Sequence, residues 1–120
     1  MYKLKNFLSR EKIEQELELL SYDPYDNQNI VNEGNRLFKE SRLEESLDLY
    51  RTAYANEPDN EMIIYNLAYI LYQLQDYPEA LNYFNLAVDL KPEFTEAIKA
   101  RDRLREKIEK LKKYTMTVYG

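Results

Sequence analysis

The chain has 120 residues, which is enough for one compact domain and too few for two ordinary ones. It contains no cysteine and no histidine, which excludes disulfides, thiolate or imidazole metal sites and a conventional catalytic triad. The net charge is −5, and no apolar run approaches the roughly 20 residues that a membrane span needs. Residues 1–12 lack an apolar core of signal-peptide length, so we expect a soluble, cytoplasmic protein.

The first predicted helix lies within residues 1–26. Ser9 suits the N-cap position, and Pro24 closes the segment. The apolar stripe of this helix consists of Ile13, Leu17 and Leu20. Pro24, Pro58 and Pro92 are equally spaced along the chain. This spacing favours a degenerate half-repeat, and the alternative is an unrelated capping helix.

Two pairs of helices follow, predicted at 28–40 with 43–56 and at 61–74 with 77–90. Helix 61–74 has apolar residues at the i, i+3, i+4, i+7 spacing of one helix face. These residues are Ile64, Leu67, Ala68, Leu71 and Leu74. Pro78 falls in the first turn of helix 77–90, where its missing N–H costs no hydrogen bond. Each pair is therefore predicted to be a helix hairpin.

The two hairpins share one sequence pattern at a constant offset. The matching pairs are Gly34 with Ala68, Leu37 with Leu71, Ser46 with Ala80, Tyr50 with Phe84, Ala53 with Ala87, and Pro58 with Pro92. A shared period of about 34 residues indicates a repeat array, and both units resemble the tetratricopeptide repeat. The first unit departs from that pattern at Glu33 and Ser46. Ser41 and Gln75 stand where the family often has a glycine between its helices.

The resemblance implies an all-α fold of stacked antiparallel helix hairpins, in which small residues lie where helices cross closely. We expect one single domain. Its parts are an N-terminal helix (1–26), repeat 1 (27–60), repeat 2 (61–94), a C-terminal capping helix (95–113) and a tail (114–120).

The capping helix is predicted to cover the end of the stack with an apolar stripe. This stripe is Ala97, Ile98, Leu104, Ile108 and Leu111. The tail alternates in a period of two and is rich in β-formers, yet the chain offers no second strand. We therefore expect the tail to be disordered, and the alternative is an extended segment that adds to a partner.

In this family the first helix of each hairpin lines a concave groove that holds a peptide or a helix of a partner. The resemblance places these residues in the groove: Asn32, Asn35, Phe38, Met62, Tyr65, Asn66, Tyr69, Tyr72, Lys99 and Arg103. Val31, Gln73, Ala100 and Lys107 fall on the same faces. Helix 61–74 is aromatic on this face as well as apolar on its buried face, which one packed side does not require. We take this second face as a binding surface, and the alternative is that the terminal helix or a second copy covers it.

Some members of the family grip a C-terminal carboxylate with two asparagines and several basic residues. Asn35 and Asn66 match the two asparagines. The positions of the basic residues are instead occupied by Val31, Glu96 and Ala100. Lys99 and Arg103 are basic but lie at other positions, so we do not expect a terminal-carboxylate clamp.

Charge divides the chain into an acidic and a basic part. Residues 27–90 carry four basic and eleven acidic side chains, whereas residues 91–120 carry nine and five. Because acidic residues interleave with the basic ones in the last helix, we interpret it as a solvated face rather than a nucleic-acid site.

These patterns predict a non-enzymatic scaffold module that binds a peptide or helix of another protein, as a monomer or weak homodimer. We expect no cofactor, metal, nucleic acid or membrane. The alternative is a self-assembling structural subunit that uses the groove or the tail for homo-oligomerisation.

Overall fold

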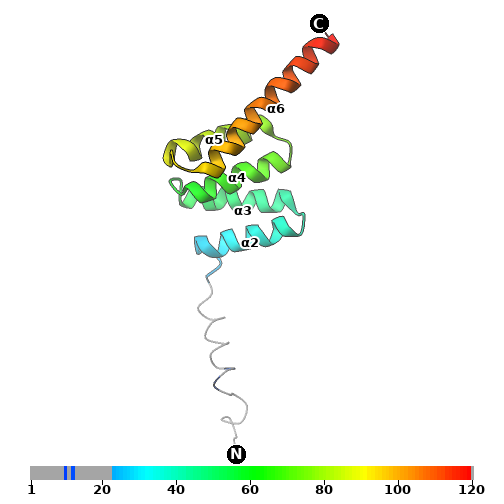
Figure 1. Ribbon diagram of the computed structural model, residues 1–120. Helices are drawn as coiled ribbons and strands as arrows, with labels where there is room; N and C mark the ends of the chain where they lie inside the picture. Colours follow the sequence, from blue (N-terminus) through cyan, green and yellow to red (C-terminus); the bar gives the residue numbers. More distant parts are fainter. Residues whose placement is uncertain (1–9, 11, 13–22, 120) are drawn as a thin grey trace, which may run out of the picture.

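The computed structural model of the protein describes residues 10, 12 and 23–119. These residues form five helices and no strand: α2 (Asn27–Lys39), α3 (Leu43–Asn56), α4 (Glu61–Gln73), α5 (Tyr77–Leu90) and α6 (Thr95–Tyr119). Successive helices run antiparallel and stack in chain order (Figure 1). The predicted all-α fold of stacked hairpins is confirmed. The helix predicted within residues 1–26 lies almost entirely outside the described residues.

The helices recur with the period that the sequence predicts. α2, α4 and α6 begin at residues 27, 61 and 95, and α3 and α5 begin at 43 and 77, so all these intervals are equal. α6 therefore stands where the first helix of a further hairpin would begin. Side-chain caps fix three of these starts. Asp26 accepts from the N–H groups of Gln28 and Asn29, and Asn60 from those of Met62 and Ile63. At the start of α5, Asp76 accepts from the N–H group of Glu79.

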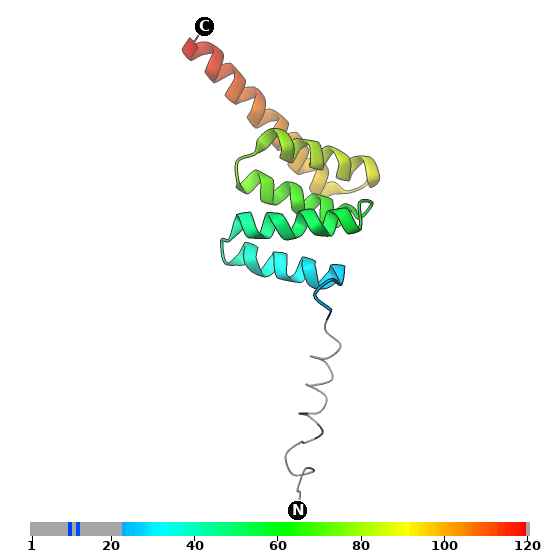
Figure 2. The ribbon, with the colours of Figure 1, turned by 180° about the vertical axis from the view of Figure 1, so that it is seen from behind.

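Small residues occupy the helix crossings. The buried small side chains are Gly34, Ser46, Ala53, Ala68, Ala80 and Ala87. Tyr50 and Phe84, each 1% exposed, fill the space between neighbouring helices. Ile63 and Ile70 of α4 join the same core, so this helix packs on two sides. The view from behind shows the four helices of the two hairpins in this stack (Figure 2).

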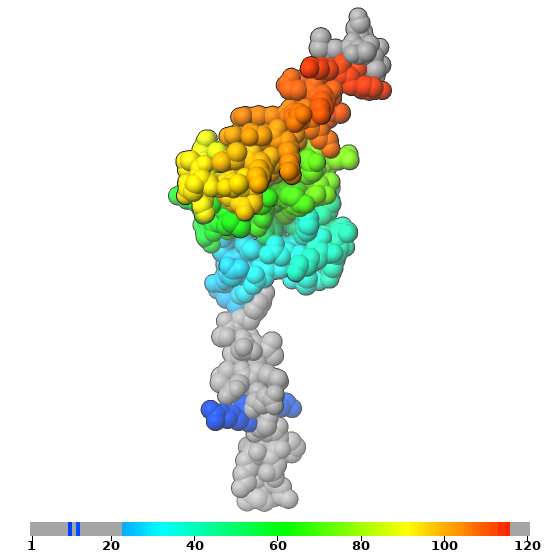
Figure 3. Space-filling view, viewed as in Figure 1, coloured from blue at the N-terminus to red at the C-terminus, as the bar shows by residue number. Residues whose placement is uncertain are grey.

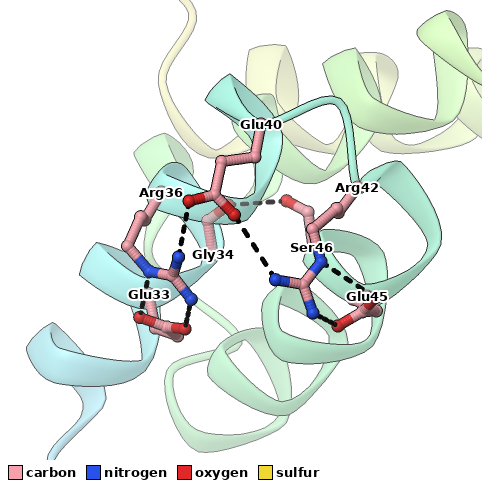
Figure 4. Close-up of polar contacts among 7 residues, drawn as sticks. All are labelled: Glu33, Gly34, Arg36, Glu40, Arg42, Glu45 and Ser46. Carbon is pink, nitrogen blue, oxygen red and sulfur yellow. Dashed lines mark hydrogen bonds and ion pairs between the residues drawn. The ribbon is translucent and has the colours of Figure 1, made fainter.

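Ser46 replaces an alanine of the repeat pattern without leaving a buried polar group unpaired. Its hydroxyl donates to the carbonyl oxygen of Gly34 on the facing helix, at 2.8 Å (Figure 4). Around the same turn, Arg36 and Arg42 both bond Glu40, at 2.7 and 3.4 Å, and Arg42 also pairs with Glu45. The turn between α2 and α3 is thus closed by polar contacts on both sides.

Ser41 and Gln75, which stand in place of the family's glycine, adopt the left-handed conformation. Their φ angles are 63° and 67°. The turn closes through Arg42 N–H to Leu37 O in the first hairpin, and the equivalent bond runs from Asp76 to Leu71 in the second, both at 2.9 Å. The missing glycine leaves the turn geometry intact and places a side chain at positive φ.

The prediction for the C-terminal tail is wrong. α6 continues to Tyr119, where the sequence predicts an irregular tail from residue 114. A helix gains one hydrogen bond for each residue it adds, whereas β-formers without a partner strand gain none. The far turns of α6 stand clear of the repeats (Figure 3).

The apolar stripe of α6 is buried over its first half. Ala97 and Leu104 are 0% and 1% exposed, and Phe94 just before the helix is also buried. Ile98 and Ile108 are half-buried. Leu111, predicted in the buried stripe, is instead 46% exposed. Within the described part of the chain, no helix is long and apolar enough to cross a membrane.

Candidate functional site

Three hollows follow one another along the exposed side of α4, and together we call them the α4 groove. The largest, the aromatic cleft, has a volume of about 300 Å³ and is lined by Tyr65, Tyr69, Tyr72, Phe84, Glu96, Lys99, Ala100, Arg103 and Leu104. The middle hollow, of about 90 Å³, is lined by Asn35, Phe38, Tyr50, Asn66, Tyr69 and Ile70. The polar hollow, of about 270 Å³, is lined by Asn27, Gln28, Val31, Glu57, Asn60, Met62, Ile63 and Asn66. Tyr69 and Asn66 are each shared by two hollows, so the three form one track from α6 to α2.

Tyr69 lies where the aromatic cleft meets the middle hollow. Its side chain is 40% exposed, and its ring centroid lies 5.8 Å from that of Phe38 on α2 and 6.5 Å from that of Tyr72. Tyr65 is half-buried, and its ring packs 5.7 Å from Phe84 and 5.1 Å from Phe94. Among the three tyrosines of the aromatic cleft, Tyr69 is therefore the most exposed to a partner, while Tyr65 also supports the fold.

The outer wall of the cleft is positively charged. Lys99 and Arg103 come from successive turns of α6, and both are exposed. In the part of the chain that the structure describes, neither forms an ion pair. Glu96, one turn earlier, adds a single negative charge to the same wall. The wall therefore offers two cations to a carboxylate.

Lys107 has a different role from the one its position predicts. Its ammonium lies over the rings of Tyr72 and Tyr77, at 5.3 and 4.9 Å from their centroids. Hydrogen bonding to Tyr77 raises the pKa of Lys107 above its ordinary value of 10.5. These contacts hold α6 against the hairpin that precedes it.

Two asparagines in the middle hollow meet at one buried hydroxyl. The Tyr50 hydroxyl donates to Oδ1 of Asn35 at 2.5 Å and accepts from Nδ2 of Asn66 at 3.2 Å. Burial raises the pKa of the Tyr50 hydroxyl above its ordinary value of 10.0. A side chain from α3 thus links the groove faces of α2 and α4.

The polar hollow is organised by Glu57. Asn27 donates to one of its carboxylate oxygens at 2.6 Å, and Asn60 donates to the other at 3.0 Å. These bonds hold the pKa of the Glu57 carboxyl below its usual 4.5, and the bond from Asn60 has the larger effect. Met62, 50% exposed, lines the apolar part of this hollow together with Val31 and Ile63.

Most of the residues predicted for the groove do line it. They are Asn35, Phe38, Met62, Tyr65, Asn66, Tyr69, Tyr72, Lys99 and Arg103. Asn32 does not line these hollows; its side chain is exposed and accepts a bond from Gln28 Nε2 within α2, at 3.0 Å. That the lining residues bind a partner stays a prediction.

Sequence reasoning missed some of the lining residues. Glu96 shares a helix face with Lys99 and Arg103 at i, i+3 and i+7, and this spacing is the signal for it. For the Tyr50 hydroxyl, the signal is that tyrosine replaces the phenylalanine of the second repeat. Among the described residues, no group of acidic side chains is arranged to hold a metal ion. The groove therefore offers apolar contact, hydrogen bonds and positive charge.

Paired helices that recur at one constant interval define a helical repeat protein. A family model described as "Tetratricopeptide repeat" matches residues 31–95, and the chain belongs to this family.

Comparison with known proteins finds relatives of the same kind. Human RNA polymerase II-associated protein 3 is 29% identical over 82 residues, which cover 68% of this chain and 12% of that protein. A structure described as the first TPR of Spaghetti (RPAP3) bound to the HSP90 peptide SRMEEVD superposes with a TM-score of 0.67. It is 28% identical, and the match covers 75% of this chain and 71% of that one.

The fold also resembles MamA from Desulfovibrio magneticus RS-1, with a TM-score of 0.67 and 22% identity. That match covers 72% of this chain and 49% of the MamA chain. The chain therefore spans a small part of the human relative and about half of MamA.

Proposed function

We propose that the protein is a non-enzymatic interaction module whose α4 groove binds a segment of another protein. The observation that carries this proposal is the second apolar face of α4. Its buried face is complete, with Ile64, Leu67 and Ala68 fully buried, yet Tyr69 and Met62 remain 40% and 50% exposed on the other side. Exposed aromatic and methionine side chains beside a groove are typical of protein-binding surfaces. The peptide held by the similar first TPR of Spaghetti supports the same use here.

The lining of the groove supports a partner segment with two chemical features. An apolar side chain fits the aromatic cleft against Tyr69 and Tyr72, and an acidic side chain next to it pairs with Lys99 and Arg103. Asn35 and Asn66 bond the partner backbone in the middle hollow. The partner segment is therefore apolar with an acidic residue at its α6 end.

Selection from a random peptide display library tests this proposal. Panning against the whole chain is expected to enrich peptides with an apolar residue near Asp or Glu. Reversing the charge at the cleft with Lys99→Glu and Arg103→Glu should lower the affinity for a selected peptide roughly tenfold.

A matched control separates this effect from net charge. Lys110→Glu with Lys112→Glu makes the same change on the same helix, beyond the cleft, where both side chains are at least 67% exposed. This control should leave affinity within about twofold at physiological salt. Failure to enrich any peptide, or equal losses in both double variants, would contradict the proposal.

Self-association is the second candidate, and one observation favours it. Leu111 and Tyr114, towards the C-terminal end of α6, are 46% and 70% exposed. Light scattering at micromolar concentration would then show a dimer or larger species, lost when residues 114–120 are removed. A monomer before and after that truncation excludes this candidate.

A further inference from the structure

Tyr50 combines a core position with a contact in the groove. Its ring occupies the same place in repeat 1 as Phe84 in repeat 2, and both are 1% exposed. Packing therefore explains the ring but not the hydroxyl. The hydroxyl extends to the middle hollow and bonds Asn35 of α2 and Asn66 of α4 at the same time.

A phenol hydroxyl has one proton, and this makes the two asparagines unequal. Because that proton is donated to Oδ1 of Asn35, Asn66 must face the oxygen with its Nδ2 group. The group of Asn35 left for a partner is then the donor Nδ2. The group of Asn66 left for a partner is the acceptor Oδ1.

We propose that Tyr50 is a positioning residue that fixes Asn35 as a donor and Asn66 as an acceptor for the backbone of a bound segment. The proposal rests on the groove function proposed above. A donor and an acceptor side by side complement an extended backbone, whose N–H and C=O groups are free. A helical segment has already bonded these groups internally. The partner is therefore bound extended at the middle hollow.

The first test uses the free protein and needs no ligand. Tyr50→Phe removes the hydroxyl and keeps the ring. NMR of the side-chain amides should show the Asn35 and Asn66 signals shifting and the Asn66 NH2 exchanging faster with solvent. Tyr54→Phe is the control, because Tyr54 lies one turn further along α3 and packs its ring on Tyr83, 5.5 Å away. Asparagine signals that respond equally to both variants, or to neither, overturn the proposal.

A second pair of variants tests the polarity and does not depend on Tyr50→Phe folding. Asn35→Asp keeps an acceptor facing the hydroxyl proton. Asn66→Asp replaces the donor by a carboxylate. That carboxylate faces the Tyr50 hydroxyl oxygen, whose proton is donated to Asn35. The melting temperature should therefore fall more for Asn66→Asp than for Asn35→Asp. Equal losses, or the reverse order, contradict the assigned polarity.

The third test uses a peptide from the display selection. Tyr50→Phe should lower the affinity for this peptide roughly two- to tenfold, and Tyr54→Phe should leave it unchanged. Methylating the peptide's backbone amides one at a time should identify one N–H whose loss weakens binding to the wild type but hardly to Tyr50→Phe. Unchanged affinity with shifted asparagine signals would overturn the role of Tyr50 in binding. If the library yields no peptide, the groove function fails, while the NMR and melting tests still decide the positioning.

Discussion

A Cβ atom on Gly34 would lie 2.9 Å from two ring carbons of Tyr50. That ring is 1% exposed and bonded through its hydroxyl, so it has little room to move. Gly34→Ala gains about 1 kcal/mol of helix propensity but overpacks the crossing by about 1–3 kcal/mol. We expect a net loss of stability in urea unfolding. Ala55→Gly, on the exposed side of the last turn of α3, gives the effect of the reverse exchange away from the helix crossing. A Gly34→Ala variant as stable as the wild type would mean that the Tyr50 ring moves aside.

Glycine at position 41 or 75, in the two hairpin turns, should stabilise the protein. Ser41 and Gln75 have φ angles of 63° and 67°, a conformation that is costly for residues with a Cβ. Ser41→Gly and Gln75→Gly should each raise the free energy of unfolding by about 0.5–1 kcal/mol, because glycine adopts this conformation freely. Thermal melts of the single and double variants measure this. A lowered melting temperature would show that these side chains stabilise the turn in another way.

Acid should destabilise the stack through Glu79. This carboxylate on α5 accepts two bonds from Arg51 on α3, at 2.9 and 3.2 Å, and they hold its pKa below the ordinary 4.5. The unfolded chain therefore binds the proton more tightly. The stabilisation is complete above about pH 4.5 and is lost as the pH falls through the folded pKa.

Unfolding free energies measured from pH 7 to pH 3 for the wild type and Glu79→Gln test this account. The difference between the two proteins should shrink as the pH falls. A difference that stays constant over this range would exclude the linkage.

Two leucines of α6 should differ sharply in their contribution to stability. Leu104 is 1% exposed, and Leu111, two turns later, is 46% exposed. Leu104→Ala should cost about 2–5 kcal/mol, whereas Leu111→Ala should stay within about 0.5 kcal/mol. Chemical denaturation of both variants checks this, and similar losses would mean that the end of α6 is buried in solution.

The sequence predicts the repeat well because its period is enforced by packing. Small residues at crossings and prolines at repeat ends recur at the same interval, and the helix bounds at 27–39, 43–56, 61–73 and 77–90 follow within one residue. The tail is mispredicted because β-propensity is a local preference, and the growing helix α6 outweighs it.

The site is predictable only in part. The resemblance to the repeat family predicts groove side chains such as Tyr69, and nine of the ten predicted site residues line the hollows. Asn32 does not line them, and its exposed side chain is bonded to Gln28 within α2 instead. The Tyr50 hydroxyl bond is a contact among three helices, so comparison of the two repeats shows the extra hydroxyl but does not predict its two partners.

The central claim is that the α4 groove binds a partner, and Tyr69→Ala tests it most directly. Tyr69 is 40% exposed and lies between two hollows, whereas Phe84 is 1% exposed in the core. The measurement is the affinity of a selected peptide by titration calorimetry, with the unfolding free energy determined on the same samples. Tyr69→Ala should cost about 2 kcal/mol or more of binding and much less stability than Phe84→Ala, for which about 3–5 kcal/mol is expected. A Tyr69→Ala variant that binds normally, or unfolds as readily as Phe84→Ala, would contradict the claim.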